Sequence, residues 1–403
     1  MPSLQNDTAA SRSHYWLRPE DCKVAELDAV LRTPANPADY PLASGVDMGV
    51  PQYDCAQLRQ QMAATSQPVL FQQQLMAEWS RVWSDGPGVL ALQGLFADLA
   101  VVGAATAVFL RMIAAERLLG AKADHFAKPG ANDRVWNALE KFCVEAPEVF
   151  AAYYGNELLA LVCEAWLGPA YQMTSQINSV NPGGVAQMAH RDYHLGFLTA
   201  AQAARYPAPV HRLSPYLTLQ GAVAHVDMPL HSGPTLYLPH SHKYLPGYLV
   251  AGQPEFQAYF DAHHVQLPLR KGDAVFFNPA LMHAAGHNRS TDICRMANLL
   301  QVSSAFGRAM ESVDRQRMVQ VLYPALRALQ QAGAVTDAAL ACAVAACAEG
   351  YAFPTNLDRD PPLGGLAPES QQGLVLRALA EQWPAPQLNQ ALQQQADKKK
   401  TTS

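Results

Sequence analysis

The chain has little charge, and the charge it has is not concentrated in one place. Of its 403 residues, 29 are Lys or Arg and 34 are Asp or Glu, so the net charge is −5. The only basic run is residues 398–400, which lie in a polar tail. Because binding to nucleic-acid phosphates needs clustered Lys and Arg, the composition argues against a nucleic-acid partner.

Cysteine pairs and targeting segments are also lacking. The seven cysteines are scattered, odd in number and form no C-x-x-C pair, which favours free thiols in a reducing compartment over disulfides or a zinc site. The polar N-terminus shows no signal peptide, so we predict a cytoplasmic protein. The most apolar run, residues 99–110, is too short to span a bilayer, and we interpret it as a buried helix with no membrane partner.

The chain divides by pattern into three parts. We predict an N-terminal extension at residues 1–80, a domain at residues 81–305, and a C-terminal helical extension at residues 306–403 with a disordered tail from about residue 393. Helical patterns occupy residues 72–83, a segment ending near 119, and residues 132–143, 147–166, 313–331 and 336–348.

Short strand-like runs dominate the middle of the chain. They cover residues 89–92, 171–180, 217–228, 235–238, 265–269, 274–277 and 295–303. Short strands at this density are typical of an antiparallel sandwich or barrel. The sequence therefore predicts a mainly β core with α-helical flanks.

A candidate metal site lies within this β region. His190 and Asp192 are two positions apart, so on an extended strand their side chains point to the same side. His283 follows 93 residues later, just past the strand predicted at residues 274–277, and is the candidate third ligand. Two histidines and one carboxylate form a facial triad that leaves open coordination positions, as in non-haem Fe(II) oxygenases.

The tripeptide H-x-D is weak evidence alone. The chain contains a second one, His225-Val226-Asp227, and thirteen histidines in all. A single histidine is usually a surface or hydrogen-bonded residue, so the context of each motif has to decide.

Three features of the context favour the first motif. The first is a polar turn at residues 271–273, which leads into the apolar strand that precedes His283. The second is Arg295, twelve residues after His283, whose guanidinium could bind the far carboxylate of 2-oxoglutarate in a bidentate way. Thr174, Gln176 and Asn178 alternate along one strand and share a face. We predict that they bind the co-substrate; the alternative is a simple solvent-exposed face.

Several motifs, in the right order and spacing, resemble the phytanoyl-CoA dioxygenase family of 2-oxoglutarate-dependent oxygenases. The resemblance covers residues 86–303, more than half of the chain. It is carried by Gly88-Val89-Leu90 and Gly94-Leu95-Phe96, by Asn181-Pro182-Gly183 with Gln187, His190, Asp192 and His194, by Ser232-Gly233-Pro234-Thr235 with residues 238–243, and by Gly272-Asp273 with His283, Gly286, Asn288, Ser290 and Arg295.

The resemblance implies a double-stranded β-helix, a jelly roll of the cupin-like kind, that uses Fe(II), 2-oxoglutarate and O2. It places His225 and Asp227 where the family has no metal ligand. Two positions depart from the family: His240 stands where glycine is common, so that turn is expected to differ. Ala285 stands where a serine often helps to hold the 2-oxo acid. The grip on the co-substrate then depends more on Arg295 and the strand of Gln176.

The expected reaction is oxidation, most commonly hydroxylation, of an unactivated C–H bond in a small molecule, with release of succinate and CO2. Desaturation, ring formation or epoxidation remain open outcomes. Two other classes are open as well: a metal-dependent hydrolase and a non-catalytic, small-molecule-binding jelly roll. His125, Phe126, His194 and Phe197 are candidates for the substrate pocket, and each of them could equally be structural.

Overall fold

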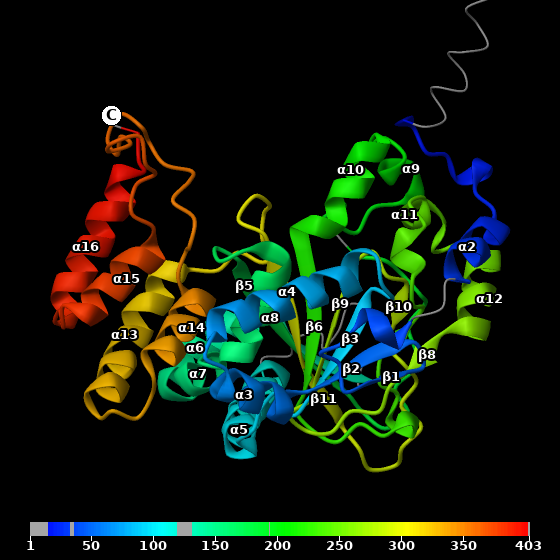
Figure 1. The fold of residues 1–403 in the computed structure, drawn as a ribbon, viewed down its shortest axis with the longest axis horizontal. Helices are drawn as coiled ribbons and strands as arrows, with labels where there is room; N and C mark the ends of the chain where they lie inside the picture. The colour runs from blue at the N-terminus through cyan, green and yellow to red at the C-terminus, as the bar shows by residue number, and fades with distance from the viewer. Residues whose placement is uncertain (1–14, 33–35, 119–130, 193, 402–403) are drawn as a thin grey trace, which may run out of the picture. The chain divides into compact units, whose positions relative to one another are not determined.

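The computed structural model describes residues 15–32, 36–118, 131–192 and 194–401, and it contains two β-sheets (Figure 1). The larger sheet has the strand order β1-β2-β3-β9-β6-β11-β5-β4, and the smaller has the order β10-β7-β8. This two-sheet arrangement is a double-stranded β-helix with helical flanks, as predicted. The strands are β1 (Gly45–Asp47), β2 (Val50–Asp54), β3 (Val89–Gln93), β4 (Asn132–Val135), β5 (Gln172–Val180), β6 (Thr218–Ala224), β7 (Leu236–Tyr237), β8 (Val265–Gln266), β9 (Ala274–Phe277), β10 (His283–Ala284) and β11 (Arg295–Ser303).

The centre of the larger sheet is built from short, fully buried strands. Strand β9 pairs antiparallel with β3 on one side and with β6 on the other, and Phe276 stands opposite Leu90 and Gly221. A Cβ atom at Gly221 would lie 2.5 Å from the Phe276 ring, so this position has no room for a larger residue. Strands buried on both faces are apolar throughout, which is why the run Ala-Val-Phe-Phe forms β9.

The described chain forms two compact units. The first comprises Met1–Ala97, Ala121–Arg134 and Asn178–Leu300, and the second comprises Asp98–Gly120, Val135–Ile177 and Gln301–Ser403, so that β5 and β11 contribute residues to both. Helices of the first unit are α2 (Val24–Leu31), α3 (Cys55–Ala64), α4 (Pro68–Ser84), α9 (Ala200–Ala203), α10 (Ala208–Leu213), α11 (Gly247–Val250) and α12 (Pro254–His263). Those of the second are α5 (Leu99–Leu118), α6 (Ala138–Glu145), α7 (Pro147–Tyr154), α8 (Glu157–Leu167), α13 (Arg315–Gln331), α14 (Asp337–Cys347), α15 (Gln371–Ala380) and α16 (Ala385–Lys398).

Two local predictions are wrong. Residues 132–143 are not one helix, because Asn132–Val135 forms the edge strand β4 and α6 begins only at Ala138. The tail predicted to be disordered from residue 393 is helical as far as Lys398. The division of the chain at residues 80 and 305 stays a prediction, and the segment before residue 80 contributes β1 and β2 to the larger sheet.

Helix α5 is longer than the apolar run in its sequence suggested. Its 20 residues are long and apolar enough to cross a membrane by length and composition, and 33% of its most apolar window is buried in the protein. The buried side chains recur every three or four residues and form one stripe: Val102, Ala105, Val108, Phe109, Met112 and Ile113. Such a stripe is typical of a helix that packs against a protein core.

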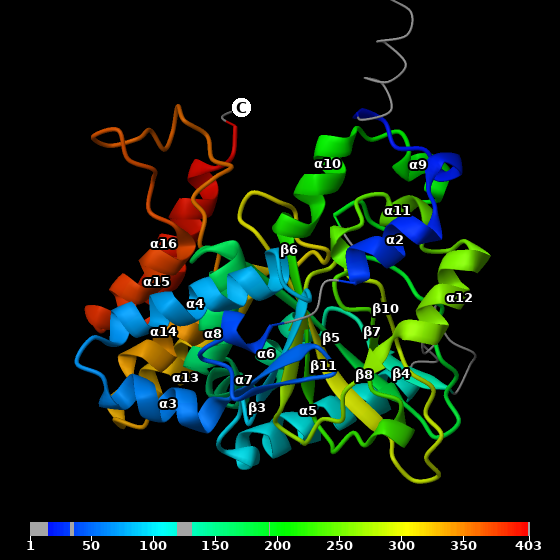
Figure 2. The same cartoon turned by 45° about the vertical axis from the view of Figure 1, so that its right-hand side comes forward.

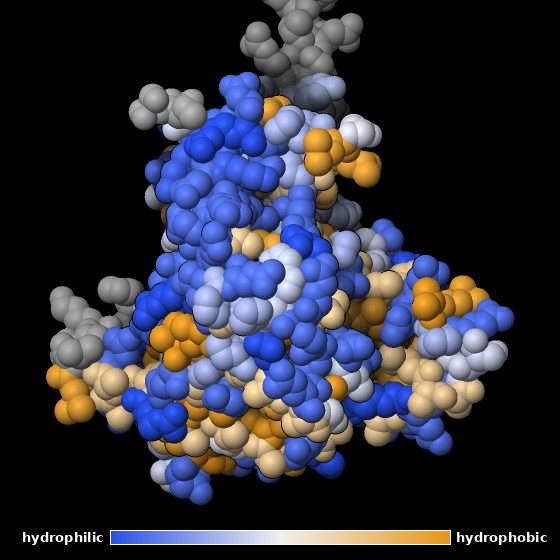
Figure 3. Space-filling model, turned by 90° about the vertical axis from the view of Figure 1, so that its left-hand side faces the viewer, coloured by the Kyte–Doolittle hydropathy of each residue, from blue (hydrophilic) through white to orange (hydrophobic). Residues whose placement is uncertain are grey.

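The molecular face drawn in Figure 3 is mostly hydrophilic, with hydrophobic residues in separate patches.

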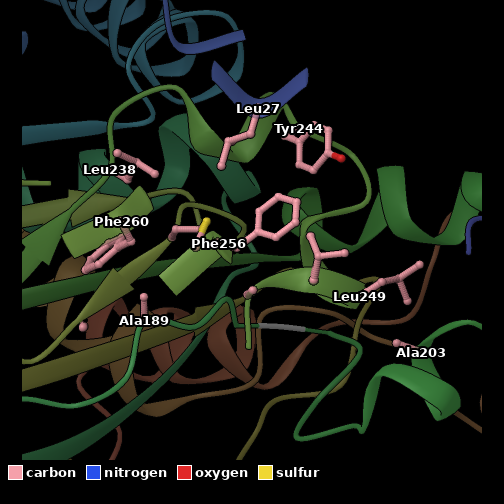
Figure 4. Close-up of a cluster of buried hydrophobic side chains, with 12 residues drawn as sticks. Leu27, Ala189, Ala203, Leu238, Tyr244, Leu249, Phe256 and Phe260 are labelled. Carbon is pink, nitrogen blue, oxygen red and sulfur yellow. The ribbon is translucent and has the colours of Figure 1, made fainter. Parts of the chain in front are cut away.

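A cluster of buried apolar side chains supports the smaller sheet, and helix α2 closes it. Leu27 of α2 is fully buried against a set that includes Tyr244 and Phe256, whose rings stack at 6.1 Å (Figure 4). In Figures 1 and 2, α2 lies beside α11 and α12. Two polar contacts hold α2 in place: the hydroxyls of Tyr244 and Tyr259 donate to Glu26 and Asp28.

Replacing Leu27 with alanine should therefore lower the free energy of unfolding by about 2–5 kcal/mol, the usual effect of a cavity in a closed core. Denaturant titration of the purified protein measures this loss. Leu230→Ala is the matched control, because Leu230 lies in the same unit and is 47% exposed. An equal loss in both variants would contradict the role of α2 as a structural part of the first unit.

Candidate metal centre

The two candidate histidine ligands lie on segments that pair with each other. His190 and His283 form an isolated antiparallel bridge in which each backbone N–H donates to the carbonyl of the other at 3.0 Å. Asp192 is held two residues further on, where its N–H donates to the carbonyl of Pro279. The ligand atoms of His190, Asp192 and His283 all lie within 4.8 Å of one another. The structure thus brings together the three residues that the sequence singled out.

Both imidazoles are oriented in the same way. The Nδ1 atom of His190 lies 3.0 Å from the carbonyl oxygen of Met188, and that of His283 lies 2.8 Å from the carbonyl oxygen of Leu281. A carbonyl can only accept, so each Nδ1 carries a proton, and Nε2 is the ring atom left to face a metal. The Nε2 atom of His283 lies 3.8 Å from Oδ2 of Asp192.

The surroundings of His283 also favour its uncharged form. Burial and, after it, the neighbouring His190 lower the pKa of His283 to about 4, although Asp192 opposes this shift. His283 is therefore neutral at physiological pH, which is the form that binds metals. Two imidazoles and one carboxylate are a donor set that suits Fe(II).

The second H-x-D motif lies elsewhere. His225 is buried, and burial lowers its pKa to about 3. The carboxylate of Asp227 accepts a hydrogen bond from the backbone N–H of Lys271 at 2.8 Å. Within the residues that the structure describes, these two do not join any group of three metal-ligating side chains.

Arg295 is a buried cation that the sheet leaves without a carboxylate partner. It begins β11 and is 6% exposed, and burial lowers its pKa to about 10, so it stays protonated at neutral pH. Its Nε has no hydrogen-bond partner among the described residues. Its main electrostatic neighbour is Tyr237, which stands opposite His283 in the pairing of β7 with β10. A buried guanidinium near the strand partner of His283, with Nε unpartnered among the described residues, fits a ligand that brings its own carboxylate.

The three polar residues of β5 are buried, so the alternative of a solvent-exposed face is wrong. Thr174 donates its hydroxyl to the carbonyl of Gln301 at 2.8 Å. Thr174 and Gln176 belong to the second unit, and Asn178 belongs to the first. Asn178 Oδ1 has no partner in the described part of the chain. Their role in binding the co-substrate stays a prediction.

The candidates for the substrate pocket differ from one another. The Nδ1 atom of His194 lies 2.7 Å from the Thr218 hydroxyl, and its backbone N–H donates to Ser214. Phe197 is 70% exposed, which suits a residue that meets a ligand at the rim of a site. His125 and Phe126 lie outside the described residues.

Three residues around the triad were missed by the sequence reasoning. Gln220 on β6 donates from Nε2 to Oδ2 of Asp192 at 2.6 Å, and the Tyr248 hydroxyl donates to the carbonyl of Asp192 at 2.8 Å. Arg191 is buried, donates to the carbonyl of Ser241 and lies over the Tyr248 ring. The only signal in the sequence was that Gln220 interrupts an otherwise apolar strand.

The structure describes both residues that depart from the family pattern. His240 has a φ of 68°, in the left-handed region that favours glycine, and the expected difference of this turn from the family stays a prediction. Ala285 offers no hydroxyl, and its backbone N–H faces Oε1 of Gln187 at 3.4 Å.

Comparison with known protein families gives a match over the part of the chain that carries these motifs. The family pattern described as "Phytanoyl-CoA dioxygenase (PhyH)" matches residues 46–297. No curated protein matches the chain.

Solved structures match at low similarity. One is the non-heme alpha ketoglutarate dependent epimerase SnoN from nogalamycin biosynthesis, with 20% identity, a TM-score of 0.42, and coverage of 59% of this chain and 82% of that one. Another is the carbocyclase SnoK from the same biosynthesis, with 19% identity, a TM-score of 0.41, and coverage of 62% and 92%. At this level of similarity, neither substrate nor reaction passes from these proteins to this chain.

Proposed function

We propose a function from one premise: the chain belongs to the phytanoyl-CoA dioxygenase family and is a 2-oxoglutarate-dependent non-haem iron dioxygenase. Its proposed reaction is oxidation, most commonly hydroxylation, of an unactivated C–H bond in a small molecule. The observation that carries this proposal is the His190–Asp192–His283 cluster together with the buried guanidinium of Arg295, whose Nε has no partner among the described residues. We assign the activity to residues 81–305 and treat residues 1–80 and 306–403 as extensions of that domain.

The residues have separate tasks in this proposal. His190, Asp192 and His283 would hold Fe(II), and the ion would supply the oxidation chemistry in which O2 and 2-oxoglutarate are consumed and succinate and CO2 are released. Arg295 pairs with the far carboxylate of 2-oxoglutarate, and Thr174, Gln176 and Asn178 are proposed to complete that subsite. Because the two Nδ1 protons are donated to backbone carbonyls, the imidazoles cannot rotate away from the cation.

The surroundings of the triad favour an apolar substrate. Residues 193–226 contain no Asp or Glu. Five large apolar side chains that flank His190 and Asp192 in the sequence are exposed: Val185, Met188, Phe197, Leu213 and Tyr216. We propose that they contribute to an apolar ligand-binding surface, since such surfaces commonly line binding sites. We propose that His194 and Phe197 contact a substrate with a largely hydrocarbon body.

The test is an anaerobic titration of the metal-free protein, first with Fe(II) and then with 2-oxoglutarate. We expect the weak visible charge-transfer band that a chelating 2-oxo acid gives with Fe(II), and we expect it to be absent in His190→Ala. His231→Ala is the matched control, since His231 is an exposed histidine of the same unit. Bound Fe(II) without the band, or without succinate formation in air, would support the hydrolase or the binding-module alternative instead.

A further inference from the structure

Gln220 makes the shortest polar contact to the candidate metal ligands. It lies in the middle of β6, is 4% exposed, and its Nε2 donates to Oδ2 of Asp192 at 2.6 Å. In the pairing of β6 with β9, Gln220 stands opposite Phe277, whose ring lies 4.7 Å from the ring of His283. Directly paired residues share one face of a sheet, so Gln220 points to the same side as the triad.

We infer that Gln220 is a positioning residue that holds Asp192 as a single-oxygen ligand of the metal. A carboxylate can bind a cation through one oxygen or through both. The hydrogen bond from Gln220 uses a lone pair of Oδ2, which makes that oxygen a weaker ligand. It also fixes the rotation of the carboxylate about its Cβ–Cγ bond. The Tyr248 hydroxyl fixes the backbone of the same residue from another side. Asp192 is thus held both at its carboxylate and at its backbone.

The chemistry of the amide suits this task. A carboxamide donates without carrying charge, so it holds the carboxylate without competing with the cation for its negative charge. The other end of the amide, Oε1, is buried and has no partner among the described residues, so the contact with Asp192 is what orients the side chain. A purely structural glutamine in a sheet interior would be expected to use both ends of its amide.

The inference rests on the proposed metal site, and the test separates the two. The probe is Co(II), added to the metal-free protein and followed by affinity and by the visible absorption of the bound ion. We expect Gln220→Leu to bind Co(II) about 10–100-fold more weakly, the usual effect of removing a hydrogen-bond partner of a metal ligand. Its absorption per bound ion should fall, because a carboxylate that binds through both oxygens raises the coordination number.

Two further variants make the outcome decisive. Gln220→Met, which fills a similar volume with a flexible side chain, should repeat the effect if Gln220→Leu does not fold. Gln52→Leu is the matched control, because Gln52 lies on β2 of the same unit and its side chain donates to the carbonyl of Val50. Wild-type affinity and absorption in both Gln220 variants would overturn the role of Gln220 alone. A wild-type protein that binds no Co(II) would overturn the metal site and the inference together.

Discussion

Asp192→Asn is expected to abolish succinate formation and to weaken Fe(II) binding by more than about 100-fold, beyond the range found for partners of ligands. Asp192 supplies the only carboxylate of the triad, because the other two candidate ligands are histidines, whose side chains carry no negative charge. In the variant, the Asn oxygen can still accept from Gln220, which turns the NH2 group toward the cation. An NH2 group has no lone pair to offer a metal.

The fold should survive this change. The Tyr248 hydroxyl binds the backbone carbonyl of residue 192 and not its carboxylate, and the N–H of that residue donates to Pro279. We therefore expect the thermal unfolding of metal-free Asp192→Asn to match that of the wild type. The control is Asp227→Asn, which changes the acid of the second H-x-D motif. Retention of a tenth or more of wild-type succinate formation in Asp192→Asn would show that the metal is held elsewhere.

The sequence predicted the middle of the fold well because its signals there are local. Apolar strands bounded by turn residues gave β9 and β11 with the bounds that the structure shows. The same reasoning failed for β4, since the polar run Asn-Asp-Arg-Val has no strand pattern and forms an edge strand only through pairing within the sheet. Strands β1 and β2 were missed for the same reason: their positions depend on partners distant in the chain.

The candidate site shows the same limit. Spacing and family motifs were enough to select His190, Asp192 and His283, and to set aside His225. Gln220 could not be found in this way, because its contact joins residues 28 apart in sequence that meet only in the folded chain. The burial of Arg295, with its Nε unpartnered among the described residues, is likewise a property of the packed sheet that a sequence does not contain.

Arg295→Leu should leave the stability of the protein unchanged or raise it, and should lower its affinity for 2-oxoglutarate. The buried guanidinium has no carboxylate partner in the described chain, and replacing an uncompensated buried charge with an apolar residue is often neutral or stabilising by about 1–4 kcal/mol. The melting temperature of the protein without 2-oxoglutarate should therefore stay the same or rise. Affinity for 2-oxoglutarate should fall by about 10–100-fold, since each hydrogen bond to a charged group contributes about 1.5–3 kcal/mol.

The measurement is thermal unfolding in Co(II) with and without 2-oxoglutarate, because a ligand that binds only the folded state raises the melting temperature. The wild type should be stabilised by 2-oxoglutarate, Arg295→Leu should not respond, and Arg295→Lys should respond weakly, since lysine keeps the charge but loses the bidentate geometry. Arg289→Leu, at an exposed arginine of the same unit, should respond as the wild type does. If Arg295→Leu melts earlier yet keeps the full response to 2-oxoglutarate, Arg295 supports the sheet and the co-substrate carboxylate binds elsewhere.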